Sequence, residues 1–134
     1  MHLTIRTPDG TLLTAENTTR LALTLENGSY EVLPLHATMV ASISYSPIRV
    51  ATTEGEHDFV GRRGVLLVDN KENSATLLLS SCTPTKELSL SSAKEYLAFI
   101  EEQLSKGESL SDFHMEFLQE EQYAIVQQVK EGKG

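Results

Sequence analysis

Side chains that could do chemistry are few in this 134-residue sequence, and their spacing does not suggest catalysis. Its histidines, at positions 2, 36, 57 and 114, lack the close spacing of zinc ligands. Cys82 is the single cysteine, so it has no partner for an internal disulfide and fits a small buried hydrophobic residue better than a reactive thiol. His36 has no nucleophile motif beside it. A contact or packing role at a turn is favoured for it over catalysis.

The acidic residues also point away from a catalytic or metal centre. Glu101–Glu102 and Glu120–Glu121 are adjacent pairs, and adjacent side chains on a helix point about 100° apart, so we expect solvated faces. The segment 69–73 superficially resembles a calcium loop but lacks the central glycine and the final bidentate glutamate, which favours a hairpin turn. The sequence therefore predicts no catalytic residue, no metal site and no cofactor.

The net charge of −8 narrows the possible partners. Nucleic-acid binding needs a basic stripe, and attachment to anionic lipid needs basic clusters. No stretch approaches the roughly 20 apolar residues that span a bilayer, and the N-terminus lacks the pattern of a secretion signal. We expect a cytosolic protein without nucleic-acid partners and without direct membrane insertion.

Residues 1–84 carry the period-two pattern of β-strands. Leu21, Leu23 and Leu25 alternate with polar or small residues before Asn27–Gly28, a hairpin signal. Short apolar stretches follow, separated by turn formers such as Ser46–Pro47 and Glu54–Gly55. The pattern predicts an antiparallel β-sandwich of about ten strands. The expected position of the segment 39–41 is the core, with a partner contact as the alternative.

Residues 85–134 change to a period of 3.6, which predicts two helices. Ser92 and Glu95 have the spacing of a capping box, and Lys106–Gly107 favours a helix end. The second helix is expected to begin at Ser109 or Ser111. The short linker makes an antiparallel helical hairpin the favoured arrangement.

One face of each predicted helix is apolar. The two stripes consist of Leu90, Ala93, Tyr96, Leu97, Ile100 and Leu104, and of Leu110, Phe113, Phe117, Leu118, Ala124 and Ile125. Glu121 and Gln128 interrupt the second stripe. Such an interruption is typical of a slightly frayed amphipathic helix or of an arm that undocks, and Glu121 could alternatively seek a lysine on a partner.

Four segments, in order, resemble the epsilon subunit of F-type ATP synthases. They are Leu3–Gly10, Tyr30–Ala37, Phe59–Val68 and Thr76–Cys82, and the resemblance covers residues 2–82. It implies a non-catalytic central-stalk subunit whose sandwich couples the gamma subunit to the c-ring of a proton- or sodium-translocating enzyme. It also implies a hairpin that lies folded or extends towards the catalytic alpha/beta head and restrains ATP hydrolysis. The implied location is cytoplasmic, at the inner face of a bacterial cell membrane.

The resemblance also implies which residues contact gamma or the c-ring: Ser29, Tyr30, Glu31, Leu35, His36, Arg62 and Arg63. Several depart from the family pattern. Ser29 replaces an acidic residue, and Glu31 and Leu35 replace glycines, so the turn must differ in shape or tolerate strain. Arg62 and Arg63 stand in a Ser-Gly-Gly connection, either as solvated cations or as partners for acidic residues of another subunit.

The nucleotide pattern of the family is lost in the hairpin. Its aspartate falls on Ser89 and its arginine on Ser92, and no arginine follows Arg63, so we expect no nucleotide binding. From residue 85 onward five lysines face ten acidic residues, a net charge of −5, which predicts weak inhibition because the family arms that inhibit well are basic. The alternative function is a stand-alone β-sandwich binding module with a dimerising helical hairpin.

Overall fold

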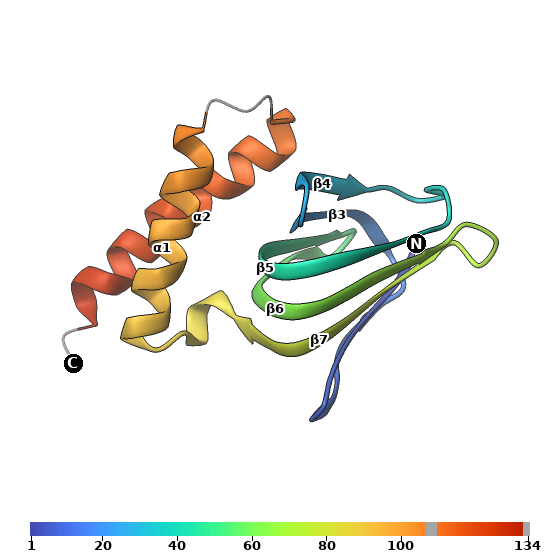
Figure 1. The fold of residues 1–134 in the computed structure, drawn as a ribbon, viewed down its shortest axis with the longest axis horizontal. Helices are drawn as coiled ribbons and strands as arrows, with labels where there is room; N and C mark the ends of the chain where they lie inside the picture. Colours follow the sequence, from blue (N-terminus) through green and yellow to red (C-terminus); the bar gives the residue numbers. More distant parts are fainter. Residues whose placement is uncertain (107–109, 133–134) are drawn as a thin grey trace. The chain divides into compact units, whose positions relative to one another are not determined.

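The computed structural model describes residues 1–106 and 110–132, and the chain divides into two compact units, Met1–Thr83 and Pro84–Gly134 (Figure 1). The first unit is built from strands and the second from helices. The division follows the point at which the sequence pattern changes from a period of two to a period of 3.6.

The first unit holds seven strands in one sheet, in the order β2-β1-β7-β6-β5-β3-β4. Their bounds are β1 (His2–Thr7), β2 (Gly10–Ala15), β3 (Thr18–Leu25), β4 (Gly28–Val32), β5 (Met39–Thr52), β6 (Gly55–Asp69) and β7 (Ser74–Pro84). β1 runs parallel to β7, whereas the pairs β1–β2, β3–β4, β3–β5 and β5–β6 are antiparallel. The expectation of about ten strands in a wholly antiparallel arrangement is wrong, because the sheet is mixed and has fewer, longer strands.

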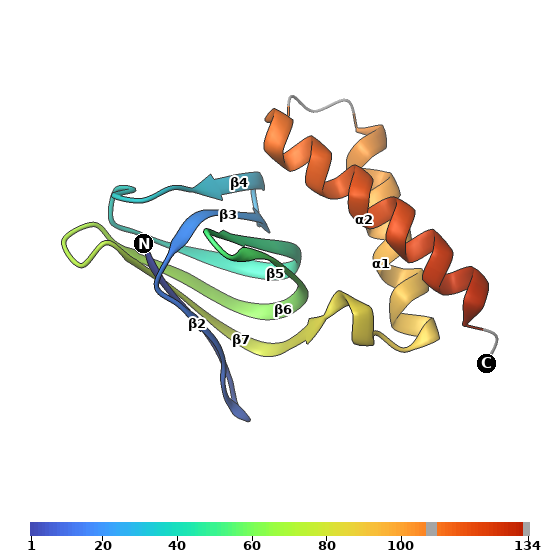
Figure 2. The same ribbon diagram turned by 180° about the vertical axis from the view of Figure 1, so that it is seen from behind.

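β5 and β6 are long because each continues through a predicted turn. Ser46–Pro47 lies inside β5, and the two strands stay in register from Met39↔Val68 to Thr52↔Gly55. The Ser46 hydroxyl accepts a hydrogen bond from the Thr24 N–H at 2.8 Å and donates to the Pro47 carbonyl at 2.6 Å. These side-chain bonds satisfy backbone groups where the sheet bends. Figures 1 and 2 show both strands curving back on themselves where a turn would have ended them.

The curvature lets both ends of the sheet enclose one core. Fifteen buried apolar side chains form a single cluster: Leu3, Ile5, Leu21, Leu23, Leu25, Val32, Ile43, Ile48, Val50, Phe59, Leu66, Val68, Ala75, Leu77 and Leu79. They come from six strands, including β1 near one end of the sheet and β4 at the other. Burial of this cluster is the main favourable contribution to folding of the unit.

Two glycines inside β6 lie where the strand is closely packed, and one of them lets β6 approach the backbone of β7. A Cβ atom on Gly64 would lie 1.8 Å from the Leu78 carbonyl oxygen, a backbone atom that cannot move aside. A Cβ on Gly61 would instead meet methyl groups of Ile48 and Leu79 at 2.8 Å. The glycines that look like a turn in the sequence are therefore sites of close packing between strands.

The second unit contains the short 3₁₀ helix η1 (Thr85–Glu87) and the helices α1 (Leu90–Ser105) and α2 (Asp112–Glu131). Ser89 caps α1, since its hydroxyl accepts a hydrogen bond from the Ser92 N–H at 3.2 Å. The capping box predicted at Ser92 and Glu95 is therefore wrong, because the helix begins one turn earlier and the Ser92 amide is already satisfied.

The start of α2 agrees with one of its two predicted positions. The Ser111 hydroxyl accepts a hydrogen bond from the His114 N–H at 3.0 Å, which is N-cap geometry. The other predicted start, Ser109, and the predicted end of the first helix at Gly107 lie outside the described residues. Within the described part, α1 ends with Lys106 as its C-cap.

The two polar residues that interrupt the apolar stripe of α2 join it to the rest of the helical unit. Glu121 is 4% exposed and accepts a hydrogen bond from the Tyr96 hydroxyl of α1 at 2.7 Å. Gln128 donates to the Thr85 carbonyl at 3.3 Å and to the Leu88 carbonyl at 3.5 Å. These contacts run in antiparallel order, as predicted for the hairpin. Glu121 thus bonds a tyrosine of its own chain.

Candidate partner-contact site

The connection from β4 to β5, residues 33–38 (here the contact loop), exposes two leucines. Leu33 is 42% exposed and Leu35 is 67% exposed. Leu35 has φ 65°, in the left-handed region that favours glycine. The sequence expectation that this turn tolerates strain is confirmed. Strained and exposed positions of this kind are concentrated at functional surfaces.

Two asparagines from the β6–β7 turn hold the contact loop in this conformation. The Leu35 N–H donates to Asn73 Oδ1 at 2.8 Å, and Asn70 Nδ2 donates to the Leu35 carbonyl at 2.7 Å. Asn70 also bonds the His36 carbonyl at 3.4 Å and, through its backbone N–H, the Thr38 hydroxyl at 3.0 Å. Sequence analysis assigned residues 69–73 only to a hairpin turn and did not connect them with the loop, because the pairing joins positions 38 residues apart.

His36 is fixed by its own surroundings. Its Nδ1 lies 2.8 Å from the Ala37 carbonyl, which can only accept, so Nδ1 donates. In that tautomer Nε2 accepts, and the Tyr30 hydroxyl 2.9 Å away donates to it. The Tyr30 and His36 rings pack edge to face with centroids 5.6 Å apart. The structure thus brings together Tyr30, Leu35 and His36 of the predicted set.

The two neighbours of Tyr30 on β4 contribute little exposed charge. The Ser29 hydroxyl is buried and has no hydrogen-bond partner among the described residues. The Glu31 carboxylate lies 3.7 Å from Arg20 Nη1, and its side chain is only 18% exposed. Ser29 and Glu31 therefore offer no fully exposed charge beside Tyr30.

An apolar pair continues the exposed surface beyond the contact loop. Val40 of β5 and Leu67 of β6 are register partners, so they project from the same face of the sheet. Val40 is 71% exposed, and the expectation that it belongs to the core is wrong, because the strand alternates there and its neighbours Met39 and Ala41 pack against the core. The pair lies in an open groove with a polar rim that includes Thr38 and Lys71.

Arg62 and Arg63 lie elsewhere in the sheet. Arg62 is the register partner of Tyr45, six residues along β5 from the position where the contact loop joins that strand. Its guanidinium sits 4.8 Å from the centroid of the Tyr45 ring, a cation–π contact. Arg63 is exposed and has φ 46°. The predicted contact residues therefore do not form one site, because Arg62 and Arg63 lie apart from the contact loop.

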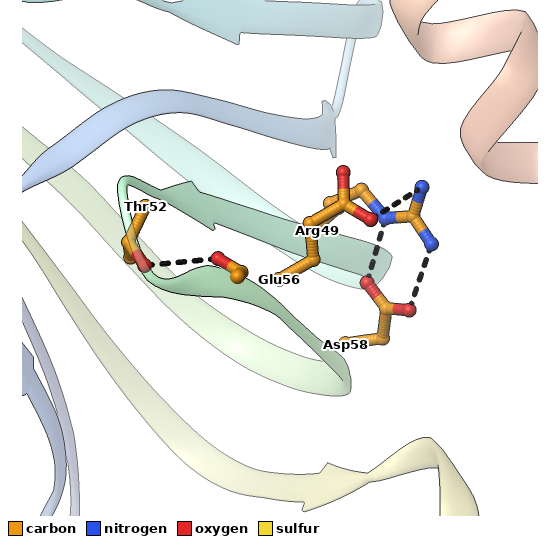
Figure 3. A network of polar contacts seen from close by, with 5 residues as sticks. Arg49, Thr52, Glu56 and Asp58 are labelled. Atoms are coloured by element: carbon orange, nitrogen blue, oxygen red, sulfur yellow. Dashed lines mark hydrogen bonds and ion pairs between the residues drawn. The ribbon is translucent and has the colours of Figure 1, made fainter.

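A polar network joins β5 and β6 and was not predicted from the sequence. Arg49, 6% exposed, donates from Nε to Asp58 Oδ1 at 2.9 Å and from Nη2 to Asp58 Oδ2 at 3.0 Å (Figure 3). Its Nη1 lies 3.4 Å from Glu56 Oε1. The nine-residue separation hides the pair in the sequence, although a β5–β6 hairpin of known register would place Arg49 opposite Asp58.

The remaining candidate groups do not form a reactive centre. Burial raises the pKa of the Cys82 thiol to about 12, which keeps it protonated and unreactive. Within residues 1–106 and 110–132, no three histidine, cysteine or acidic side chains converge on a possible metal position. Neither helix, over its described residues, combines the length and hydropathy needed to cross a membrane.

The fold defines a small β-sheet protein followed by a helical hairpin. Residues 1–82 match the family model described as ATP synthase, Delta/Epsilon chain, beta-sandwich domain. The chain therefore belongs to the ATP synthase delta/epsilon chain family, and the resemblance to its epsilon chains is confirmed. It is accordingly a non-catalytic subunit.

Known proteins agree with this assignment. The chain is 24% identical over 112 residues to the ATP synthase epsilon chain of Pediococcus pentosaceus, covering 84% of this chain and 79% of that one. A chain in a structure of the Euglena gracilis mitochondrial ATP synthase matches with a TM-score of 0.60 and 16% identity, over 93% of this chain and 78% of its own. A chain in the central stalk and c-ring structure from Tetrahymena thermophila matches with a TM-score of 0.59 and 14% identity, over 96% of both chains.

Proposed function

We propose that this chain is the central-stalk epsilon subunit of a proton- or sodium-translocating F-type ATP synthase, where it couples gamma to the c-ring. The observation that carries the proposal is the strained, exposed contact loop, which overlaps Tyr30–Ala37, one of the four segments that resemble the family, and lies within the residues that the family model matches. A fixed loop on a rigid sheet can transmit torque between two partners without chemistry of its own. In this proposal the protein lies at the cytoplasmic face of a bacterial cell membrane.

The direct test is co-purification of the full chain with the gamma subunit of the same enzyme. We expect a stable complex, which survives gel filtration at micromolar concentration. Failure to bind gamma, together with formation of a stable homodimer, would contradict the proposal. That result would support a stand-alone sandwich module that dimerises through its hairpin. The sandwich contacts are expected to include the contact loop and, at their separate position, Arg62 and Arg63.

The hairpin of this subunit, in our proposal, does not sense nucleotide. The Ser89 hydroxyl already accepts the Ser92 N–H, and both residues stand where the family pattern has a charged side chain. The described part of the hairpin contains no arginine to form charge-assisted bonds with a triphosphate. Titration of the purified protein with ATP should give no binding heat at millimolar nucleotide.

We further propose that the hairpin restrains ATP hydrolysis only weakly. Its net charge of −5 opposes contact with an acidic surface of the catalytic head. Removing residues 85–134 should therefore raise ATP hydrolysis by the assembled enzyme less than about twofold. A much larger rise would show that the hairpin inhibits through a contact that does not depend on basic charge.

A further inference from the structure

We infer that the contact loop presents Leu35 as an apolar knob to the rotor formed by gamma and the c-ring, and that Asn70 and Asn73 are the residues that position it. This inference rests on the proposed function. It adds to it the chemistry of the contact, which is apolar rather than ionic, and a positioning role for two residues of a distant turn.

The apolar character follows from what the loop exposes. Leu35 and Leu33 are its exposed large side chains, at 67% and 42%. On β4, which leads into the loop, Glu31 lies beside Arg20 and the Ser29 hydroxyl is buried. In contrast, Asp69 at the end of β6 and Lys71 and Glu72 of the neighbouring turn are exposed charges of mixed sign. Because residues 33–38 expose leucines and include no Asp, Glu, Lys or Arg, the partner surface that fits the loop itself is an aliphatic hollow.

The positioning role follows from the backbone of Leu35. A leucine at φ 65° is unfavourable unless its surroundings hold it there. Asn73 binds its N–H at 2.8 Å and Asn70 binds its carbonyl at 2.7 Å, so both backbone polar groups of the strained residue are bonded from one turn. Without these bonds the loop would relax, and the Leu35 side chain would point elsewhere.

The conformation of the β6–β7 turn, residues 70–73, places Asn70 and Asn73 beside the contact loop. Asn73 has φ 47°, a conformation that asparagine tolerates better than most residues, and its N–H bonds the Asn70 carbonyl at 3.1 Å. Its carbonyl accepts the His2 N–H at 3.0 Å, which ties the turn to β1. Asn70 and Asn73 (here the clamp) are therefore anchored to the sheet, and their bonds to Leu35 restrict the movement of the contact loop.

The test measures binding of the full chain to the purified gamma–c-ring rotor of the same enzyme. Leu35→Asn keeps a residue that tolerates the left-handed conformation but removes the apolar side chain. Asn73→Gly keeps the turn conformation but removes the acceptor for the Leu35 N–H. Asn17→Gly, at the β2–β3 turn, is the matched control for loss of a turn asparagine.

We expect Leu35→Asn to weaken rotor binding by about tenfold or more, because it removes one leucine side chain that is buried in the complex. Asn73→Gly should weaken it by about three- to tenfold. The double variant should bind no worse than Leu35→Asn alone, since the clamp acts through Leu35. Raising NaCl from about 50 to about 500 mM should change wild-type affinity less than about twofold.

If the wild-type chain binds the rotor and the Leu35→Asn and Asn73→Gly variants bind it with the same affinity, this inference is overturned and the proposed function stands. A steep loss of affinity as the NaCl concentration rises would likewise overturn this inference, because it would show that the contact is ionic and not apolar. Failure of the wild-type chain to bind the rotor would overturn the proposed function and the inference with it.

A second measurement needs no partner. Amide hydrogen exchange at Leu35 should quicken at least about tenfold in Asn73→Gly, because its N–H loses its acceptor, while exchange in β3 stays unchanged. Unchanged exchange at Leu35 would show that Asn73 does not position the loop.

Discussion

Arg49 lies on β5, with Ala22 of β3 as its register partner on one side and Asp58 of β6 on the other. Its two bonds to Asp58 are bidentate, the geometry in which a buried ion pair offsets most of its desolvation. Glu56 also faces the guanidinium, but at 3.4 Å and with a side chain that is 45% exposed. The two acidic residues should therefore contribute very differently to stability.

Replacing Asp58 with alanine leaves the buried guanidinium without its closest counter-charge. We expect Asp58→Ala to lower the free energy of unfolding by about 3 kcal/mol. Glu56→Ala, the matched control on the same strand, should cost less than about 1 kcal/mol because that carboxylate is solvated. Urea titration followed by circular dichroism measures both, and equal losses would contradict the assignment.

The thiol of Cys82 gives a prediction that depends on pH. Its folded-state pKa of about 12 lies above the ordinary value of 9.0, so the folded state holds the proton more tightly. The stability that this confers is complete below pH 9 and is lost as the pH rises from 9 towards 12. At pH 8 the native thiol should react with a disulfide reagent roughly a thousandfold more slowly than in urea. Equal rates would show an accessible thiolate.

At the level of single residues, local backbone conformation could be predicted from the sequence, whereas hydrogen bonds between distant residues could not. The strain at Leu35 was predictable because a glycine is expected at that position of the turn. The Asn70 and Asn73 clamp was not, since hydrogen bonds across 38 residues leave no periodic signal. The same holds for Arg49 and Asp58, whose pairing requires the register of a hairpin before it can be inferred.

Among the elements, β5 and β6 show where local rules fail. Proline and paired glycines are ordinary turn signals, yet here they lie within strands of 14 and 15 residues. Tertiary packing decides the outcome, because the Ser46 hydroxyl bonds the Thr24 N–H and Gly64 lets the backbones of β6 and β7 approach. The helices, in contrast, were predictable in number and order, because a long 3.6 period is a strong signal.

Gly61 and Gly64 provide a comparison on one strand, β6. Gly64→Ala should cost about 3 kcal/mol or more, because the new methyl group meets backbone atoms of Leu78. Gly61→Ala meets only side-chain methyl groups of Ile48 and Leu79, which can shift, so its cost should be about 1 kcal/mol. Thermal unfolding of both variants tests this, and the reverse order of stability would contradict the close approach of β6 to β7.

The contact between α1 and α2 gives a matched tyrosine pair. Tyr96→Phe removes the hydroxyl that donates to buried Glu121, and we expect a loss of about 2 kcal/mol in unfolding free energy. Tyr123→Phe removes the same atom from a side chain that is 70% exposed and should change stability by less than about 0.5 kcal/mol. Urea unfolding monitored at 222 nm distinguishes them. Indistinguishable variants would mean that the Tyr96–Glu121 bond does not hold the hairpin.

On the scale of the whole molecule, a sheet that encloses one core carries the contact loop, and a helical hairpin follows it. The two-part organisation was readable from the change of period, and the family from the order of four short segments. The curvature that reduces ten predicted strands to seven was not readable, because it depends on contacts between strands far apart in sequence.

Ion pumping by an ATP synthase depleted of this subunit is the most direct test of the central claim. Adding back the purified chain should restore ATP-driven pumping in membrane vesicles in proportion to the amount bound, because torque then passes from gamma to the c-ring. The Leu35→Asn variant should need a higher concentration to reach the same rate. Depleted vesicles that pump at the full rate, or that gain nothing from saturating wild-type chain, would contradict a coupling role.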